Sequence, residues 1–221
     1  MSGINSINNY SENFINSFLN QNKKQELNGF SSSIQSESVL NSISTMGKQI
    51  NDIYNTLKTN GDEKAIEGFK SALNSIGTNP GDFSSINFIN FANDLAKNDK
   101  DTLSNLFTTI EKMDDSGLSN NVYGFINTVT NFANTFGKDN LNGFLNTTSN
   151  LADKFHNEDA LKSASTLNDY LKMVNSISNI KDNNINKTEV YKTFVKGINK
   201  QNNIDSINKY IKDFNKDNQY F

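Results

Sequence analysis

The chain has 221 residues and a net charge of −3, and its 41 asparagines and 24 serines contrast with a single proline, Pro80. It has no cysteine, arginine or tryptophan and only one histidine, His156. These absences exclude disulfides, cysteine-ligated metal sites, thiolate nucleophiles, guanidinium clamps on phosphate and sites that need two histidines. The length allows one large domain or two small ones.

A low hydrophobic content of 34% is combined with 16 phenylalanines and 7 tyrosines. Disordered chains usually have few aromatic residues and a high net charge, whereas this chain is rich in aromatic residues and nearly neutral. Each aromatic side chain buries a large apolar area. We therefore expect a folded chain with a thin, phenylalanine-rich core.

The charges are balanced, with 21 lysines and 24 acidic residues. A strong nucleic-acid binder usually carries a basic face that contains arginine, so no nucleic-acid partner is expected. The densest lysine clusters are Lys23-Lys24 and the tail 187–212, where asparagine and aspartate separate the lysines. Charges spread in this way indicate a solvated surface.

No stretch approaches the 18 consecutive apolar residues typical of a transmembrane helix. The first residues lack the basic and apolar regions of a cleavable signal peptide. We expect a protein that is cytoplasmic or is secreted without a cleavable signal. The heavy use of asparagine and lysine indicates an AT-rich genome and favours a bacterial source.

The spacing of apolar residues predicts an all-α fold with about ten helices. Residues 1–30 contain the first, an amphipathic helix whose apolar stripe is formed by Tyr10, Phe14, Ile15, Phe18 and Leu19. Its terminal position and polar continuation indicate a segment that detaches from the body and packs in the groove of a partner. It is therefore the candidate partner-binding site, although a first helix of the bundle is the preferred interpretation of this segment.

Residues 31–77 are predicted to form a helical hairpin. Its first helix has apolar residues spaced alternately four and three apart, namely Val39, Ile43, Met46, Ile50, Ile53 and Leu57. Because this seam is shorter than a stable coiled coil needs, we expect it to pack within the chain, and a monomer is favoured. Asn60-Gly61 ends this helix, and the second helix covers 62–77.

The linker 78–85 contains Pro80 and marks the predicted boundary of the body 86–221. Apolar stripes predict seven helices in the body, at 86–96, 103–113, 118–136, 141–155, 160–180, 190–198 and 204–214. The breaks between them are rich in Asn, Asp and Gly, which cap helix ends. Short connections favour antiparallel neighbours, so we expect hairpins stacked as an elongated bundle or a helical-repeat array.

Two segments of the body match at an offset of 41 residues. Phe91-Ala92-Asn93 corresponds to Phe132-Ala133-Asn134, and the helices that follow correspond with a three-residue gap, Leu103, Leu106 and Phe107 matching Leu141, Phe144 and Leu145. The repeated unit is a helix end, a polar turn and a helix start. Such units cannot bury an apolar face alone and must stack.

Few residues are candidates for catalysis or metal binding. His156 follows a predicted helix, so it is either a general base oriented by Glu158 or Asp159, or a side chain favoured by the negative end of the helix dipole, and the second interpretation is preferred. The loop 182–188, from Asp182 to Thr188, has oxygen ligands spaced as in an EF-hand but lacks its glycine and final glutamate. We expect a turn and a helix N-cap there, and no metal, cofactor or catalytic residue.

Absent cysteine and tryptophan, scarce proline and a helical N-terminus make this composition similar to that of flagellin-type and other type III-exported proteins. The similarity is one of composition, without an aligned motif. We expect a non-enzymatic interaction or structural protein, exported without a cleavable signal, whose partner is an export chaperone or another host or bacterial protein. The alternatives are a cytosolic regulator or inhibitor of one partner protein and, less favoured, an enzyme with a site of Asp, Lys and Tyr.

Overall fold

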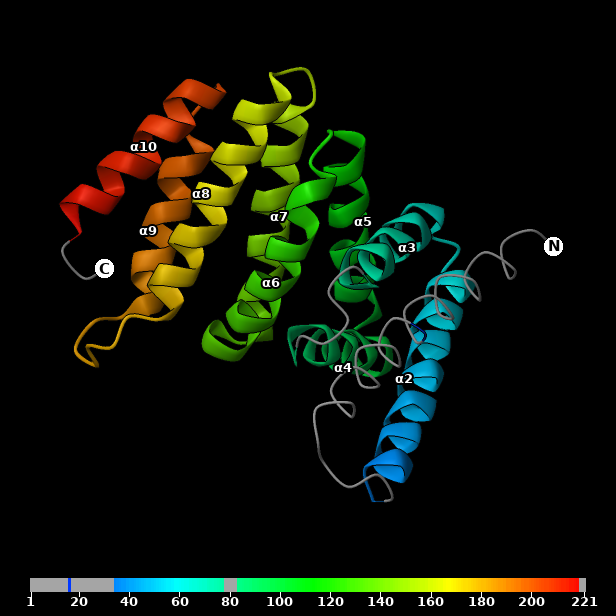
Figure 1. Ribbon diagram of the computed structural model, residues 1–221. Coiled ribbons are helices and arrows are strands. Elements are labelled where there is room, and N and C mark those ends of the chain that lie inside the picture. Colours follow the sequence, from blue (N-terminus) through cyan, green and yellow to red (C-terminus); the bar gives the residue numbers. More distant parts are fainter. Residues whose placement is uncertain (1–15, 17–33, 78–82, 219–221) are drawn as a thin grey trace. The chain divides into compact units, whose positions relative to one another are not determined.

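The computed structural model describes Asn16 and residues 34–77 and 83–218, and it is all-α, as the apolar spacing predicts (Figure 1). These residues form nine α-helices and no strands. The helices are α2 (Ile34–Thr59), α3 (Glu63–Gly77), α4 (Phe83–Asn98), α5 (Lys100–Asp115), α6 (Val122–Phe136), α7 (Lys138–Phe155), α8 (Ala160–Ser178), α9 (Lys187–Asn199) and α10 (Ile204–Asp217). Each corresponds to one predicted helix, while the predicted helix within residues 1–30 lies, apart from Asn16, outside the described residues.

One helix begins later than its apolar stripe predicts. The stripe covers 118–136, but α6 begins only at Val122, after the 3-10 turn η1 (Ser119–Asn121). Leu118 is fully buried ahead of this turn, and the side chain of Asn121 donates to the carbonyl oxygen of Ala164 at 2.9 Å. Contacts with α8 therefore determine the conformation of residues 118–121. The spacing of apolar residues along the chain does not reveal these contacts.

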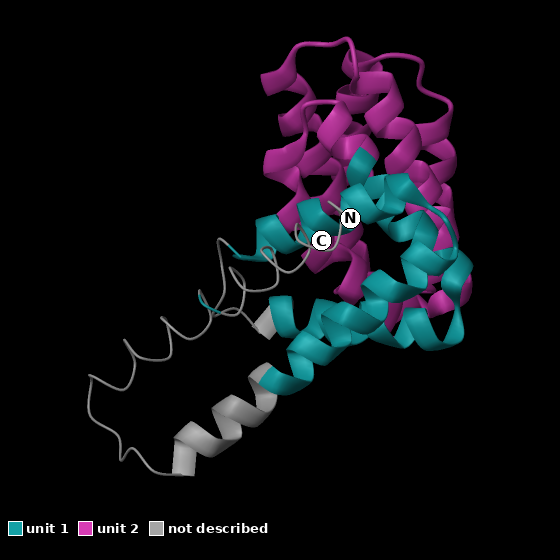
Figure 2. Ribbon diagram, turned by 90° about the vertical axis from the view of Figure 1, so that its right-hand side faces the viewer, with its two compact units in different colours: residues 1–111 teal, residues 112–221 magenta. Residues whose placement is uncertain are grey.

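The described residues group into two compact units that divide between Glu111 and Lys112, inside α5 (Figure 2). The predicted boundary is elsewhere, in the linker 78–85, most of which lies outside the described residues. Helices α2 and α4, which lie on opposite sides of that linker in the sequence, pack against each other within unit 1. The division into 31–77 and 86–221 stays a prediction.

The core of unit 1 is built on the predicted seam of α2. Its described members Met46, Ile50, Ile53 and Leu57 are buried, and α2 packs against α3 and α4. The seam thus packs within the chain, as expected. A second part of this core is aromatic, because the ring of Phe107 in α5 meets the rings of Phe69 and Phe88 edge-on, at centroid distances of 4.9 and 6.1 Å.

A column of aromatic rings forms the centre of unit 2. Neighbouring rings lie within 18° of parallel, with centroids 5.7 to 6.2 Å apart, in the order Phe125, Phe144, Tyr170, Phe194 and Tyr210. Each helix from α6 to α10 contributes one ring, in chain order. Because stacked rings add attraction to the apolar area that they bury, the column joins five consecutive helices.

Two phenol groups lie in this core. Tyr170 is fully buried and Tyr191 is 4% exposed. The Tyr170 hydroxyl lies near Thr148 and Tyr191, but neither phenolic oxygen has a hydrogen-bond partner of good geometry among the described residues. Burial raises the pKa of both phenols, and the neighbouring Tyr170 raises the pKa of Tyr191 further.

We expect the free energy of unfolding to fall as the pH rises above about 10, the pKa of tyrosine in an unfolded chain. In that range the unfolded chain releases protons that Tyr170 and Tyr191 keep when folded, so a higher pH favours unfolding by up to about 1.4 kcal/mol per pH unit for each tyrosine. Urea titrations from about pH 8 to about pH 11 measure this loss. Over the same pH range, the free energy of unfolding of the double variant Tyr170→Phe/Tyr191→Phe should fall less than that of the unchanged chain. An equal fall in both would contradict the role given to the two phenols.

Candidate functional site

A groove of about 570 Å³ lies between the start of α7 and the length of α9, both in unit 2. Its lining is mostly apolar. The lining residues are Asp139, Asn140 and Gly143 of α7 with Tyr191, Lys192, Val195, Lys196, Asn199 and Lys200 of α9 and its C-cap. Concave, largely apolar sites with a few polar groups are the usual form of a binding site.

The sequence of α9 separates a buried face from a row of lysines. Tyr191, Phe194 and Ile198 are buried, and their spacing of three and four residues keeps them on one face of the helix. Lys192, Lys196 and Lys200 are spaced four residues apart, so they share another face, and all three are exposed. Burial of the first set therefore positions the second along the edge of the groove.

The groove carries an excess of positive charge. Lys192 Nζ lies 3.0 Å from Glu189 Oε1 in the preceding turn, whereas no ion pair of Lys196 or Lys200 occurs within the described part of the chain. The one carboxylate in the lining belongs to Asp139, which is exposed in the first turn of α7. A helix N-terminus favours an acidic side chain at that position.

Gly143 leaves the α7 side of the groove open. A Cβ at this position would meet no packed neighbour within 4 Å. The next residue, Phe144, is fully buried in the aromatic column and fixes this part of α7. Val195 in the α9 wall is partly exposed. An apolar side chain of a bound molecule therefore has room between Gly143 and Val195.

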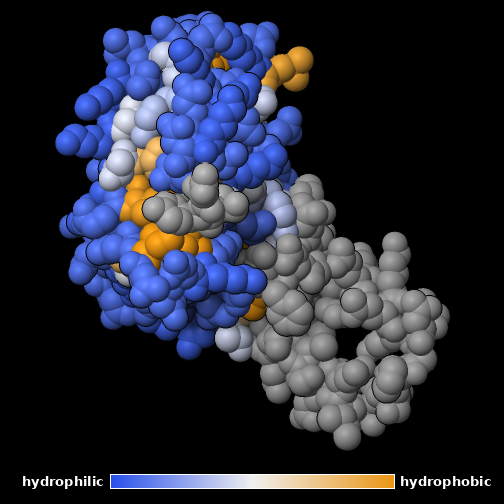
Figure 3. Space-filling view, turned by 90° about the vertical axis from the view of Figure 1, so that its left-hand side faces the viewer, coloured by the Kyte–Doolittle hydropathy of each residue, from blue (hydrophilic) through white to orange (hydrophobic). Residues whose placement is uncertain are grey.

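Figure 3 views the side of the molecule that α9 and α10 occupy in Figure 1. Its surface is largely hydrophilic, with one larger hydrophobic area between hydrophilic regions and a separate hydrophobic group that protrudes near the top of the view. Among the described residues, Leu161 at the start of α8 is the exposed large hydrophobic side chain, at 83%. A single exposed leucine is common on soluble proteins, so it does not define a site.

A smaller groove of about 340 Å³ lies in unit 1, beside α2 and the end of α4. Two of its lining residues already use their hydroxyl groups, because Thr56 donates to the carbonyl oxygen of Asp52 and Thr59 to that of Asn55. Its two lysines, Lys97 and Lys100, do not form a row along one helix. This groove offers fewer groups to a partner than the one in unit 2.

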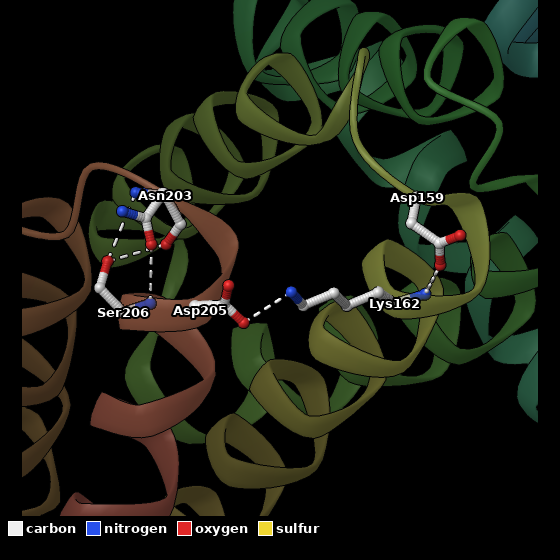
Figure 4. A network of polar contacts seen from close by, with 5 residues as sticks. All are labelled: Asp159, Lys162, Asn203, Asp205 and Ser206. Carbon is white, nitrogen blue, oxygen red and sulfur yellow. Dashed lines mark hydrogen bonds and ion pairs between the residues drawn. The ribbon is translucent and has the colours of Figure 1, made fainter.

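A network of polar contacts joins the starts of α8 and α10 (Figure 4). Lys162 Nζ lies 2.6 Å from Asp205 Oδ1, and this hydrogen bond raises the pKa of Lys162. Asp159 accepts from the backbone N–H of Lys162 and caps α8, while Asn203 and Ser206 form a capping box for α10. Helix capping accounts for these contacts.

The residues predicted to bind a partner, namely Tyr10, Phe14, Ile15, Phe18 and Leu19, lie outside the described residues. Their role stays a prediction. His156 is exposed and is the C-cap residue of α7, the position that the preferred interpretation gives it. In the loop 182–188, Asp182 Oδ1 accepts from the backbone N–H of Asn184 at 2.9 Å, and Asn186 caps α9, which confirms the expected turn and N-cap.

Neither a metal centre nor a membrane span can be located in the described ranges. No three His, Asp or Glu side chains of these residues lie together in a way that could hold a metal ion. No helix among the described residues is both long and apolar enough to cross a membrane. No protein-family model, curated protein or solved structure matches the chain.

The sequence alone does not single out this groove. The tail 187–212 resembles ordinary solvated surface, although the four-residue spacing of Lys192, Lys196 and Lys200 places them on one helix face. The wall formed by α7 has no comparable signal, because the meeting of α7 and α9 across a groove depends on how both helices pack around α8.

Proposed function

We propose that the chain is a non-enzymatic interaction protein that binds a partner protein in the groove between α7 and α9. The observation that carries this proposal is the placement of Lys196 and Lys200, exposed and without an ion pair in the described part of the chain, beside the open space at Gly143. Charged groups that border an unfilled apolar groove are a common arrangement for orienting a ligand.

An enzyme is the less favoured alternative, although Asp139, Tyr191 and Lys192 all line the groove. Acid–base chemistry there would need convergent carboxylates or a lysine withdrawn from water. Asp139 is the one carboxylate in the lining, the lysines are exposed, and the Tyr191 hydroxyl lies near Tyr170 in the core. An exported structural protein and a cytosolic regulator would both use the groove for binding.

The test compares the full chain with two glycine variants in capturing proteins from an extract of the cells that produce it. Gly143→Leu fills the groove, whereas Gly124→Leu places the same side chain on the exposed side of α6, where a Cβ meets only Leu171 Cδ1 at 3.9 Å. Leucine favours the helix more than glycine does, so both variants should fold.

We expect one protein to be captured by the full chain and by Gly124→Leu, and about tenfold less of it by Gly143→Leu, because a leucine in the groove displaces an apolar contact of the partner and a loss of about 1.4 kcal/mol weakens binding tenfold. The captured protein, once purified, should bind the chain directly in a titration. Equal capture by both variants, or no captured protein, would contradict the proposal.

A further inference from the structure

We infer that the occupant of the groove is an amphipathic helix of another protein that carries carboxylates four residues apart; this inference rests on the proposed function. Lys192, Lys196 and Lys200 follow α9 at one lysine per turn and, at 1.5 Å per residue, span about 12 Å. A second helix lying along α9 repeats its side chains with the same period. Glutamates at i, i+4 and i+8 of that helix would each face one lysine.

The floor of the groove fits the apolar face of such a helix. Gly143 has no side chain in front of it, and Val195 is partly exposed on the opposite wall. A small residue lets a neighbouring helix approach closely, so that a row of its side chains enters the groove. A leucine on the stripe of that helix that adjoins the carboxylates would enter the space at Gly143. Helices of this kind bind grooves by combining apolar anchors with charged flanks.

Charge favours this occupant over a nucleic acid. Three lysines and one carboxylate, that of Asp139, line the groove, so its positive charge is small beside that of a nucleic-acid site, which has to neutralise many phosphates. The chain has no arginine, and Tyr191, the one aromatic residue of the lining, is 4% exposed and offers no face on which a base could stack.

Charge also argues against the chain's own N-terminal segment as the occupant. Residues 1–33 contain Glu12 and Glu26 but also Lys23 and Lys24, so their charges cancel. Opposite charge on the occupant would speed association and fix its register along the lysine row. An acidic helix of a different protein provides that charge.

The test measures the binding of a fluorescent helical peptide of about 18 residues, long enough to be partly helical in water. It carries glutamate at i, i+4 and i+8 and leucine on the adjoining stripe. The full chain is compared with the triple variant Lys192→Gln/Lys196→Gln/Lys200→Gln. The matched control is Lys209→Gln/Lys212→Gln/Lys216→Gln, which removes three exposed lysines of α10 outside the groove.

The full chain and the α10 control should bind the peptide with similar affinity, and the α9 variant about tenfold more weakly, as three solvent-exposed charge pairs would give. A peptide with glutamine in place of glutamate should also bind the full chain about tenfold more weakly. Added salt should weaken binding of the acidic peptide. Equal losses in both triple variants would overturn the inference. Tighter binding of single-stranded RNA, or of a peptide of residues 1–30, would also overturn it.

The two proposals can fail separately. If capture of a cellular partner depends on Gly143 but the acidic peptide does not bind, the inference about the occupant is wrong and the proposed function stands. If Gly143→Leu changes neither capture nor peptide binding, both are wrong. Circular dichroism of every variant shows whether the helices are retained.

Discussion

Replacing Phe144 by alanine should lower the free energy of unfolding by about 4 kcal/mol, the cost of removing a large buried aromatic side chain and leaving a cavity. Phe144 is fully buried. Its ring stacks on those of Phe125, Phe132 and Tyr170, at centroid distances of 5.7, 4.8 and 6.2 Å. Because these rings belong to α6 and α8, the loss should destabilise packing on both sides of α7. Urea unfolding followed by circular dichroism measures it.

Phe144→Leu is the matched variant, since leucine refills most of the volume but cannot stack. It should cost about 1.5 kcal/mol. If alanine and leucine cost the same, the stabilisation would come from ring stacking alone and the cavity argument would be wrong. If neither variant costs more than about 0.5 kcal/mol, the level of an ordinary surface substitution, Phe144 would not lie in the core.

Gly68→Ala should destabilise unit 1 by about 3 kcal/mol, at the upper end of the usual cost of overpacking. A Cβ at Gly68 would overlap the carbonyl oxygen of Phe107 and lie 2.7 Å from its carbonyl carbon and 3.0 Å from the backbone nitrogen of Glu111. These are backbone atoms of α5, so no rotamer change relieves the overlap. Helices α3 and α5 must separate, which also disturbs the edge-on contact of Phe69 with Phe107.

The control for this variant is Gly143→Ala, where the added Cβ meets no packed neighbour. Alanine loses less backbone freedom than glycine in a helix, so Gly143→Ala should stabilise the chain by about 0.5 to 1 kcal/mol. The melting temperatures of the two variants should therefore shift in opposite directions. A destabilisation of similar size in both would show that the loss of helical glycine, and not the close approach of α3 to α5, explains the effect.

The spacing of apolar residues was sufficient to predict the helices, because burial of one face decides where a helix packs. In α10, for example, Ile204, Ile207, Ile211 and Phe214 belong to the predicted stripe, and all four are buried. The breaks were also predictable. Gly61, Gly117 and Gly137 have positive φ angles of 70°, 73° and 75°, a conformation that glycine adopts without steric cost.

The predicted internal match has a partial counterpart in burial. Leu103, Leu106 and Phe107 of α5 are buried, and so are their counterparts in α7, Leu141, Phe144 and Leu145. The match between α4 and α6 is looser, because Phe132 is buried whereas Phe91 is partly exposed. The packing around a residue therefore differs between the two segments even where the residue type is the same.

Contacts between helices could not be predicted from the sequence. Gly68 resembles any other glycine until α5 lies against it, and the order of the aromatic column depends on which faces of five helices converge. The candidate site likewise depends on how helices pack against one another. Its lysine row follows from helical spacing, but its open space at Gly143 exists only because α7 and α9 are separated there.

The most direct test of the proposed binding function is the ratio of partner captured by Gly143→Leu to partner captured by Gly124→Leu, measured on equal amounts of folded protein. Both variants add the same side chain to a helix of unit 2, and only Gly143 lines the groove. Binding in the groove predicts a ratio of about one tenth. A ratio of about one, with the same partner captured by both variants, would contradict it.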